Sequence, residues 1–388
     1  MPFLYRLIAI ILATVFSVLP AQAVLGPESI PAAFDELLKN QTLSNPAMIV
    51  IDGSTGAVIY EKNAYSQRKP ASVMKMLTGA VTVEYLDATS VFNTTVSINP
   101  EIKTVIVRGS YDPWISLDHK IARKMNRASL PYMGFRTLTY VKEFNKGSLK
   151  NYKVIYSGLY SQDVANLKSF WAKRNFKPAM KSVTDDEAFI SMGEQIVSEN
   201  SPTVAALLDW TLLWSDNLIA ERLARLSAKA AGFSMDEKGV DKVFREILAK
   251  FEIDDSKLVV ADASGLSRKN KITAHLMGEL LYKLRKDEKF ALIYLGLPVG
   301  GVSGTLRTRF LTTAPSAVGL VRAKTGTLNG TATLAGYVQS TDREYIFVTL
   351  ADEIAKGNSA LNKARAAIDR VLGRIAAPNI PAEISPAP

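Results

Sequence analysis

The sequence predicts an α+β protein, in which an antiparallel sheet is flanked by helices, an all-helical subdomain lies beside it, and a β-rich α/β domain is inserted. Strand patterns occur at both ends of the chain, in residues 47–60 and 324–350, and helical patterns dominate residues 202–285 between them. The third observation is a change of composition over residues 89–199, where β-branched segments alternate with clusters of basic residues. With 388 residues and 47% hydrophobic content, the chain can bury a large core divided into two or three units.

The first part of the chain, residues 24–88, is expected to begin with a helix and a hairpin. Residues 30–38 have a helical period, and residues 47–52 have the pattern of a buried strand. A glycine-containing turn at 53–56 leads into the returning strand 57–60. We therefore expect the hairpin to be followed by a helix that begins near Pro70.

Residues 89–199 are interpreted as an inserted domain of mixed structure. Its basic clusters are interpreted as solvent-exposed faces of the domain. The alternative is a surface that contacts a polymer. A helix is expected at 163–174, and strands are expected at residues 94–98, 104–107, 132–141 and 154–156.

The second part of the main domain, residues 200–375, begins with helical periodicity and ends with strands and a last helix. The strands at 334–339 and 345–350 alternate around a polar turn, which predicts a hairpin. Because antiparallel sheets combine strands from distant parts of a chain, we expect this hairpin to join residues 47–60 in one sheet. The expected helices are residues 202–213, 218–231, 236–251, 273–285 and 358–375.

Both termini are expected to lie outside the fold. Residues 1–23 have an early positive charge at Arg6, an apolar run at 7–19 and a small-x-small cleavage pattern, which predicts a secretory signal peptide. The alternative is an uncleaved membrane anchor, but a spanning helix needs about 20 apolar residues. Residues 376–388 hold four prolines and are expected to be disordered.

The charge and the lack of cysteine limit the function classes. The net charge of +10 favours anionic surroundings such as envelope polymers, phospholipid headgroups or nucleic acid, and export argues against nucleic acid. Without cysteine there is neither a disulfide framework nor a lipid-modified cysteine. We expect a protein exported to the periplasm or the extracellular space, with no stable membrane anchor and no cofactor.

Ser72 and Lys75 form the first candidate for chemistry. Pro70 suits a helix entrance, and a residue three positions after Ser72 lies over the same face, so the Lys75 amine can reach the hydroxyl. A similar spacing, Ser66 to Lys69, runs into Pro70, which disfavours a helix there. Taken alone, Ser72 and Lys75 also fit an N-terminal serine and a solvated lysine.

Two later motifs are further candidates. Ser215 and Asn217 lie in a short connection between helical stretches, where Ser215 is either a cleft residue or the cap of the next helix. Lys324, Thr325, Gly326 and Thr327 begin the final strands. Because Gly326 has no Cβ, another backbone can approach this edge, whereas the alternative is an ordinary edge-strand lysine.

Ser-x-x-Lys, Ser-x-Asn and Lys-Thr-Gly in this order are the signature of β-lactamases and penicillin-binding proteins. The chain resembles the class C low-molecular-mass penicillin-binding proteins, which are D-alanyl-D-alanine carboxypeptidases and endopeptidases of bacterial cell walls. The resemblance covers both sides of the insertion and implies a β-lactamase/transpeptidase-like fold. The match extends beyond the three motifs, over residues 201–221, 262–270, 297–306 and 323–338.

The resemblance implies a serine carboxypeptidase that acts through an acyl-enzyme on peptidoglycan peptides and is acylated by β-lactams. In this scheme Ser72 attacks, Lys75 accepts its proton, and Ser215 relays the proton to the leaving group. Asn217 holds the substrate amide, and Lys324, Thr325, Gly326 and Thr327 bind the terminal carboxylate and the substrate backbone.

Other function classes are less favoured. His119 and His275 are the two histidines, and their separation argues against a metal site or a histidine-based triad. The remaining alternatives are a β-lactamase and a catalytically slow protein that senses β-lactams or binds the wall. The oligomeric state stays open.

Overall fold

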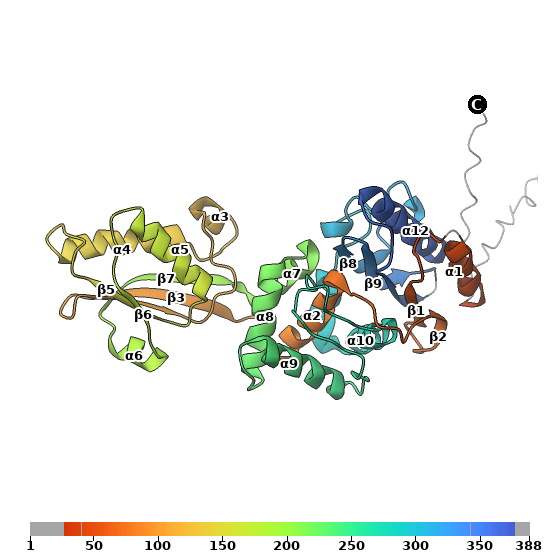
Figure 1. The fold of residues 1–388 in the computed structure, drawn as a ribbon, viewed down its shortest axis with the longest axis horizontal. Helices are drawn as coiled ribbons and strands as arrows, with labels where there is room; N and C mark the ends of the chain where they lie inside the picture. Colours follow the sequence, from red (N-terminus) through yellow and green to blue (C-terminus); the bar gives the residue numbers. More distant parts are fainter. Residues whose placement is uncertain (1–26, 40, 342, 377–388) are drawn as a thin grey trace, which may run out of the picture.

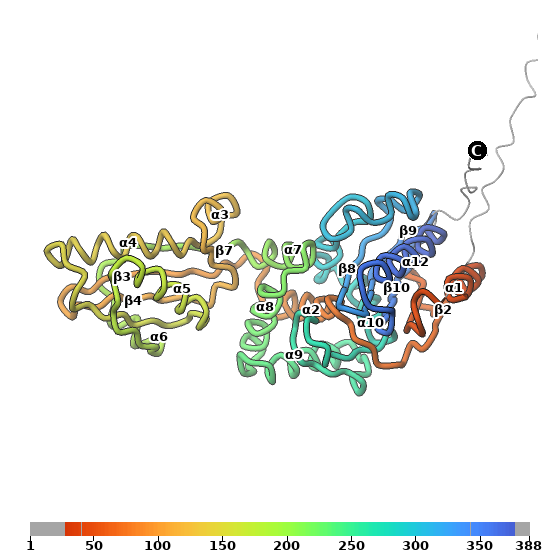
Figure 2. Tube along the Cα trace, turned by 45° about the horizontal axis from the view of Figure 1, so that its top comes forward, coloured from red at the N-terminus to blue at the C-terminus, as the bar shows by residue number. Residues whose placement is uncertain are grey.

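The computed structural model describes residues 27–39, 41–341 and 343–376, and it contains two units (Figure 1). One unit holds a five-stranded antiparallel sheet and a helical block, and the other holds a second five-stranded sheet. Figure 2 shows the second unit projecting from one end, while helices α1 (Ile30–Lys39) and α12 (Asn358–Ala376) lie side by side at the other end. The predicted α+β class is confirmed.

The antiparallel sheet joins the two ends of the chain, as the strand patterns predicted. Its order is β2-β1-β10-β9-β8, and Ile49 lies opposite Val348 where β1 meets β10. The strands are β1 (Ala47–Asp52), β2 (Val58–Lys62), β8 (Val321–Leu328), β9 (Thr331–Gln339) and β10 (Glu344–Ala351).

Both faces of this sheet are buried. Ile49 and Ile51 belong to the core shared with helix α10 (Ala274–Lys286), whereas Met48 and Val50 belong to the core under α1 and α12. Each such side chain contributes about 1.5–3 kcal/mol when fully buried. The sheet therefore sits between two apolar layers that fix its position.

The helical block lies beside the sheet and supports the segment that follows Pro70. Helix α2 packs against α7, α8 and α9. The predicted helices end within a few residues of the observed ones. The elements are α2 (Lys75–Tyr85), α7 (Val204–Trp214), α8 (Asn217–Ala230), α9 (Glu237–Lys250) and α11 (Ala291–Gly296).

The second sheet is mixed and has the order β6-β5-β4-β3-β7. Strands β4, β5 and β6 are parallel, whereas β3 pairs antiparallel with β4 and β7. Its strands are β3 (Val91–Asn99), β4 (Thr104–Gly109), β5 (Lys153–Ser157), β6 (Met180–Ser182) and β7 (Glu194–Thr203). Its helices are α3 (His119–Lys124), α4 (Leu130–Phe144), α5 (Ser161–Ala172) and α6 (Asp185–Ile190).

The strand predicted at residues 132–141 is wrong, because this segment forms helix α4. Ser129 caps the helix by accepting a hydrogen bond from the Tyr132 N–H, and a proline stands in the first turn. Met133, Thr137 and Val141 are buried along one helical face. The β-branched and aromatic residues of the segment suggested a strand, but the cap and the helical spacing of the buried positions decide the structure.

Several expectations concern residues at the limits of the described structure. The signal peptide predicted at 1–23 lies outside the described residues, as does residue 377 onward of the predicted tail. Ala376 belongs to α12 and is buried. Strand β7 continues to Thr203, past the expected domain boundary at 199. Within residues 27–39, 41–341 and 343–376, no helix combines the length and the apolar character that a membrane crossing requires.

Candidate active site

Ser72 stands at the entrance of a buried helix. A 3₁₀ turn, η2 (Ala71–Met74), follows Pro70 and continues directly into α2. This turn carries the side chain of Lys75 back toward Ser72, and the Lys75 Nζ lies 3.0 Å from the Ser72 Oγ. The structure therefore brings together the two residues of the first motif.

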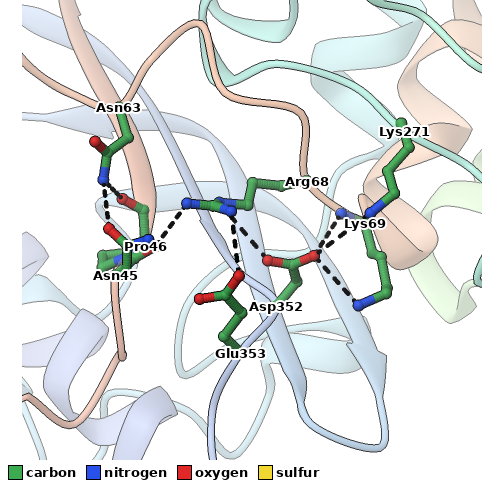
Figure 3. A network of polar contacts seen from close by, with 8 residues as sticks. All are labelled: Asn45, Pro46, Asn63, Arg68, Lys69, Lys271, Asp352 and Glu353. Carbon is green, nitrogen blue, oxygen red and sulfur yellow. Dashed lines mark hydrogen bonds and ion pairs between the residues drawn. The ribbon is translucent and has the colours of Figure 1, made fainter.

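The segment before Ser72 is tied to the end of β10 by a polar network around Asp352 (Figure 3). The Lys69 backbone N–H donates to Asp352 at 3.1 Å, and its Nζ lies 3.4 Å away. Arg68 and Lys271 also face this carboxylate, at 3.7 Å and 4.0 Å. Because Asp352 is buried, these contacts hold the approach to Ser72 against the sheet.

Lys75 is enclosed by three oxygen atoms. Besides Ser72, its Nζ lies 2.7 Å from the Asn217 Oδ1 and 2.7 Å from the Ser264 carbonyl oxygen. The residue is 0% exposed, and burial lowers the pKa of Lys75 to about 8 although the charges of Glu221 and Asp262 act in the other direction. With this pKa, roughly one tenth of the molecules carry a neutral Lys75 amine at pH 7, able to accept a proton.

The second motif lies between α7 and α8. Ser215 ends α7 with a left-handed backbone, φ 63° and ψ 39°. The cap of α8 is Asp216, whose side chain accepts a hydrogen bond from the Ile219 N–H at 3.0 Å. Ser215 is therefore not needed as the cap, and Asn217, the first residue of α8, points its amide oxygen at Lys75.

The third motif lies on β8, at the edge of the sheet. Lys324 is 0% exposed, its Nζ donates to the Thr325 carbonyl oxygen at 3.2 Å, and burial together with the Lys75 charge lowers its pKa well below the usual value. A Cβ at Gly326 would stand 2.1 Å from the Thr333 Oγ1 and 2.8 Å from the Pro70 carbonyl oxygen. Glycine thus permits the close approach of β8 to the turn that carries Ser72.

The three motifs surround one cavity of about 370 Å³. Its lining includes Ser72, Ser215, Asn217, Thr325, Gly326 and Thr327. Lys75 and Lys324 lie behind this lining. The arrangement places a hydroxyl with a nearby amine next to an exposed strand edge, which suits acyl transfer to a serine.

Sequence reasoning missed the residues that hold and complete this cavity. The Glu221 carboxylate accepts hydrogen bonds from the N–H groups of Ala263 and Ser264, which positions the Ser264 carbonyl oxygen over Lys75. Residues 262–270 matched the resembled family, but no sequence pattern showed that they touch Lys75. Arg309 and Arg365 also line the cavity.

The histidines lie elsewhere. The His119 Nδ1 is 3.0 Å from the Ser129 Oγ in the second unit, and the His275 Nδ1 is 3.3 Å from Glu279 on α10. Neither lines the cavity that contains Ser72. The amine of Lys75, 3.0 Å from the Ser72 Oγ, is therefore the candidate proton acceptor in this arrangement.

Comparison with known families matches most of the chain. A model described as the D-Ala-D-Ala carboxypeptidase 3 (S13) family matches residues 167–375, and a model described as D-alanyl-D-alanine carboxypeptidase matches residues 36–150.

Individual relatives match either most of the chain or about two fifths of it. Carboxypeptidase DacB of Mycolicibacterium smegmatis is 29% identical over 374 residues, which covers 84% of this chain and 80% of the relative. A D-alanyl-D-alanine carboxypeptidase of Actinomadura sp. is 34% identical over 160 residues, or 40% of this chain and 29% of the relative.

Solved structures share the fold. Penicillin-binding protein 4 from Haemophilus influenzae has a TM-score of 0.68 at 17% identity, and the match covers 88% of this chain and 98% of that chain. A predatory endopeptidase from Bdellovibrio bacteriovorus, in complex with an immunity protein, has a TM-score of 0.57 at 15% identity, covering 85% and 92%.

Proposed function

Because this chain belongs to the D-Ala-D-Ala carboxypeptidase 3 (S13) family, we propose that it is a serine D-alanyl-D-alanine carboxypeptidase with Ser72 as its nucleophile. The observation that carries the proposal is the 3.0 Å approach of the buried Lys75 amine to the Ser72 hydroxyl, at the wall of a cavity bounded by β8. The substrate is a peptidoglycan stem peptide that ends in D-Ala-D-Ala.

Acylation begins when the neutral Lys75 amine takes the Ser72 proton while Oγ attacks the carbonyl carbon of the penultimate D-alanine. The proton then passes by way of Ser215 to the nitrogen of the departing D-alanine, and the peptide bond breaks. Water attacks the resulting ester, which releases the shortened peptide and restores the Ser72 hydroxyl.

The developing oxyanion needs two donors, and the backbone N–H groups of Ser72 and Thr327 are assigned this role. Asn217 uses its amide oxygen on Lys75, so its amide nitrogen is the atom that holds the substrate backbone. Thr325, Gly326 and Thr327 bind the substrate strand and its carboxylate end at the β8 edge, and the buried Lys324 supports this edge from behind. β-Lactams acylate Ser72 because their ring amide and carboxylate resemble the dipeptide.

Endopeptidase activity is part of the proposal. The cavity is bounded by a strand edge, along which a longer peptide can pair its backbone with β8. A peptide crosslink whose scissile bond follows a D-alanine presents the same carbonyl to Ser72. The enzyme would then cleave crosslinks as well as terminal residues.

The proposed location of the enzyme in the cell follows from its proposed substrate. Wall peptides lie outside the cytoplasmic membrane, so the proposal includes export through the segment 1–23, with residues 24–88 and 200–375 forming the catalytic domain and residues 89–199 forming the insertion. The charge of +10 suits an anionic envelope polymer.

The test uses protein lacking residues 1–23 with a D-Ala-D-Ala pentapeptide, a cross-linked muropeptide and a chromogenic β-lactam. Release of D-alanine supports the carboxypeptidase, and cleavage of the crosslink adds the endopeptidase. Rapid β-lactam turnover would indicate a β-lactamase, and labelling without peptide turnover would indicate a sensor. Ser72→Ala should abolish every activity, whereas Ser66→Ala, in the other Ser-x-x-Lys spacing, should leave them unchanged.

A further inference from the structure

The cavity that contains Ser72 carries positive charge from two arginines, one of which lies on α12. Among the residues that the structure describes, Arg309 and Arg365 are the arginines in its lining, and no lysine lines it. Lys75 and Lys324 are both 0% exposed, and the Lys324 ammonium group is directed at the Thr325 carbonyl oxygen. A cation that touches a ligand in this cavity must therefore come from an arginine.

Arg309 is already committed to a carboxylate. Its Nε lies 3.0 Å and 2.9 Å from the two carboxylate oxygens of Asp369, and its Nη2 also contacts Asp369. Asp369 is 2% exposed and accepts a further hydrogen bond from Thr313. This bidentate pair neutralises the Arg309 guanidinium.

Arg365 has no such partner. Its Nη2 donates to the Thr327 Oγ1 at 2.8 Å, and in the described part of the chain it forms no ion pair with a carboxylate. Burial and the neighbouring Arg309 lower its pKa, but an arginine keeps its charge in proteins. With Asp369 bonded to Arg309, one guanidinium charge in the cavity remains uncompensated.

The bond between Arg365 and Thr327 also orients the hydroxyl. Because the Thr327 Oγ1 accepts from Arg365, its own proton is directed at another acceptor. Thr325 is paired in a similar way with Thr305, at 2.8 Å between the two Oγ1 atoms. The strand edge therefore presents the Thr327 hydroxyl as a donor beside a guanidinium that has no carboxylate partner among the described residues, which suits a carboxylate with two acceptor oxygens.

We propose that Arg365, together with the Thr327 hydroxyl, binds a free carboxylate on the leaving residue of the substrate, and so makes the enzyme favour substrates whose leaving residue carries an ionised carboxyl group. This inference rests on the proposed function and adds a residue outside the three motifs. The carboxylate lies on the leaving-group side of the scissile bond, where it aligns the carbonyl with Ser72. Lys324 supports the strand from behind.

The role of Arg365 is measurable as the ratio of the acylation rates for a free acid and for its methyl ester. A hydrogen-bonded charge pair contributes about 10- to 100-fold to binding or rate. Arg365→Gln should therefore slow acylation by a penicillin with a free carboxylate by about 10- to 100-fold. It should leave acylation by the methyl ester of the same penicillin unchanged, because the ester carries no charge for Arg365 to bind.

Two further variants control this comparison. Arg370→Gln makes the same change on the exposed side of the same helix, outside the cavity, and should leave both rates unchanged. Arg365→Lys keeps the charge and should recover part of the preference for the free acid. Melting curves of the variants establish that α12 is intact.

The peptide arm uses binding rather than turnover. Calorimetry with Ser72→Ala and with Ser72→Ala/Arg365→Gln compares a D-Ala-D-Ala peptide with its C-terminal amide. The inference predicts that the first protein prefers the acid and the second does not. An unchanged preference, or an equal loss for acid and amide, overturns the role of Arg365. If intact protein is not acylated by any β-lactam, the proposed function itself fails, while the binding comparison still decides the role of Arg365.

Discussion

Raising the pH should accelerate acylation of Ser72 until the Lys75 amine is fully deprotonated. With the pKa of Lys75 at about 8, roughly one tenth of the molecules carry the neutral amine at pH 7, against about 0.03% for an ordinary lysine. The second-order rate constant should rise about tenfold per pH unit below pH 7 and level off above pH 9. Stopped-flow measurements with a fluorescent penicillin between pH 5.5 and pH 10 provide the profile.

Glu221→Gln tests the cause of this profile. The Glu221 charge raises the pKa of Lys75, and glutamine can still accept the hydrogen bonds from Ala263 and Ser264. The variant should keep the fold and move the midpoint of the profile to lower pH. A wild-type profile that climbs steadily past pH 10, or a midpoint that moves upward in the variant, would refute the assignment of Lys75 as the base.

Three substitutions test the structural support of the site. Gly326→Ala places a Cβ against the Thr333 hydroxyl, so we expect the free energy of unfolding in a denaturant melt to fall by about 1–3 kcal/mol and acylation to slow. An unchanged melt would contradict the close approach of β8 to the turn that carries Ser72. Arg309→Ala leaves the buried Asp369 carboxylate without its cation and should lower the free energy of unfolding by about 3–5 kcal/mol. A loss below about 1 kcal/mol would contradict this expectation, because it would show that water solvates Asp369 in place of Arg309. Asp216→Ala removes the cap of α8 and should lower the free energy of unfolding by about 1 kcal/mol in the same denaturant melt. A variant as stable as the wild type would contradict the role of this cap.

The fold was predictable where local patterns and buried faces agree. The hairpin of β9 and β10 alternates around a polar turn, and α12 has one apolar face, so each element could be read from its own residues. The segment of α4 shows the opposite case. Its valine, threonine and tyrosine residues favour a strand, yet burial of Met133, Thr137 and Val141 against the second sheet selects the helix.

The candidate site was predictable only as far as its motifs extend. Ser72, Ser215 and Lys324 each belong to a short pattern, and the structure brings these patterns to one cavity. Ser264 contributes a backbone carbonyl from 189 positions beyond Lys75, which no side-chain pattern encodes. Arg365 occupies a polar position of an amphipathic helix, where sequence alone predicts exposure to solvent.

Mass spectrometry of the intact protein after incubation with a penicillin shows directly which oxygen attacks. We expect one acyl group per molecule, located by peptide mapping on Ser72, and no adduct on Ser72→Ala. An adduct on another residue, or an undiminished adduct on Ser72→Ala, would contradict the proposal that the three motifs converge around this serine.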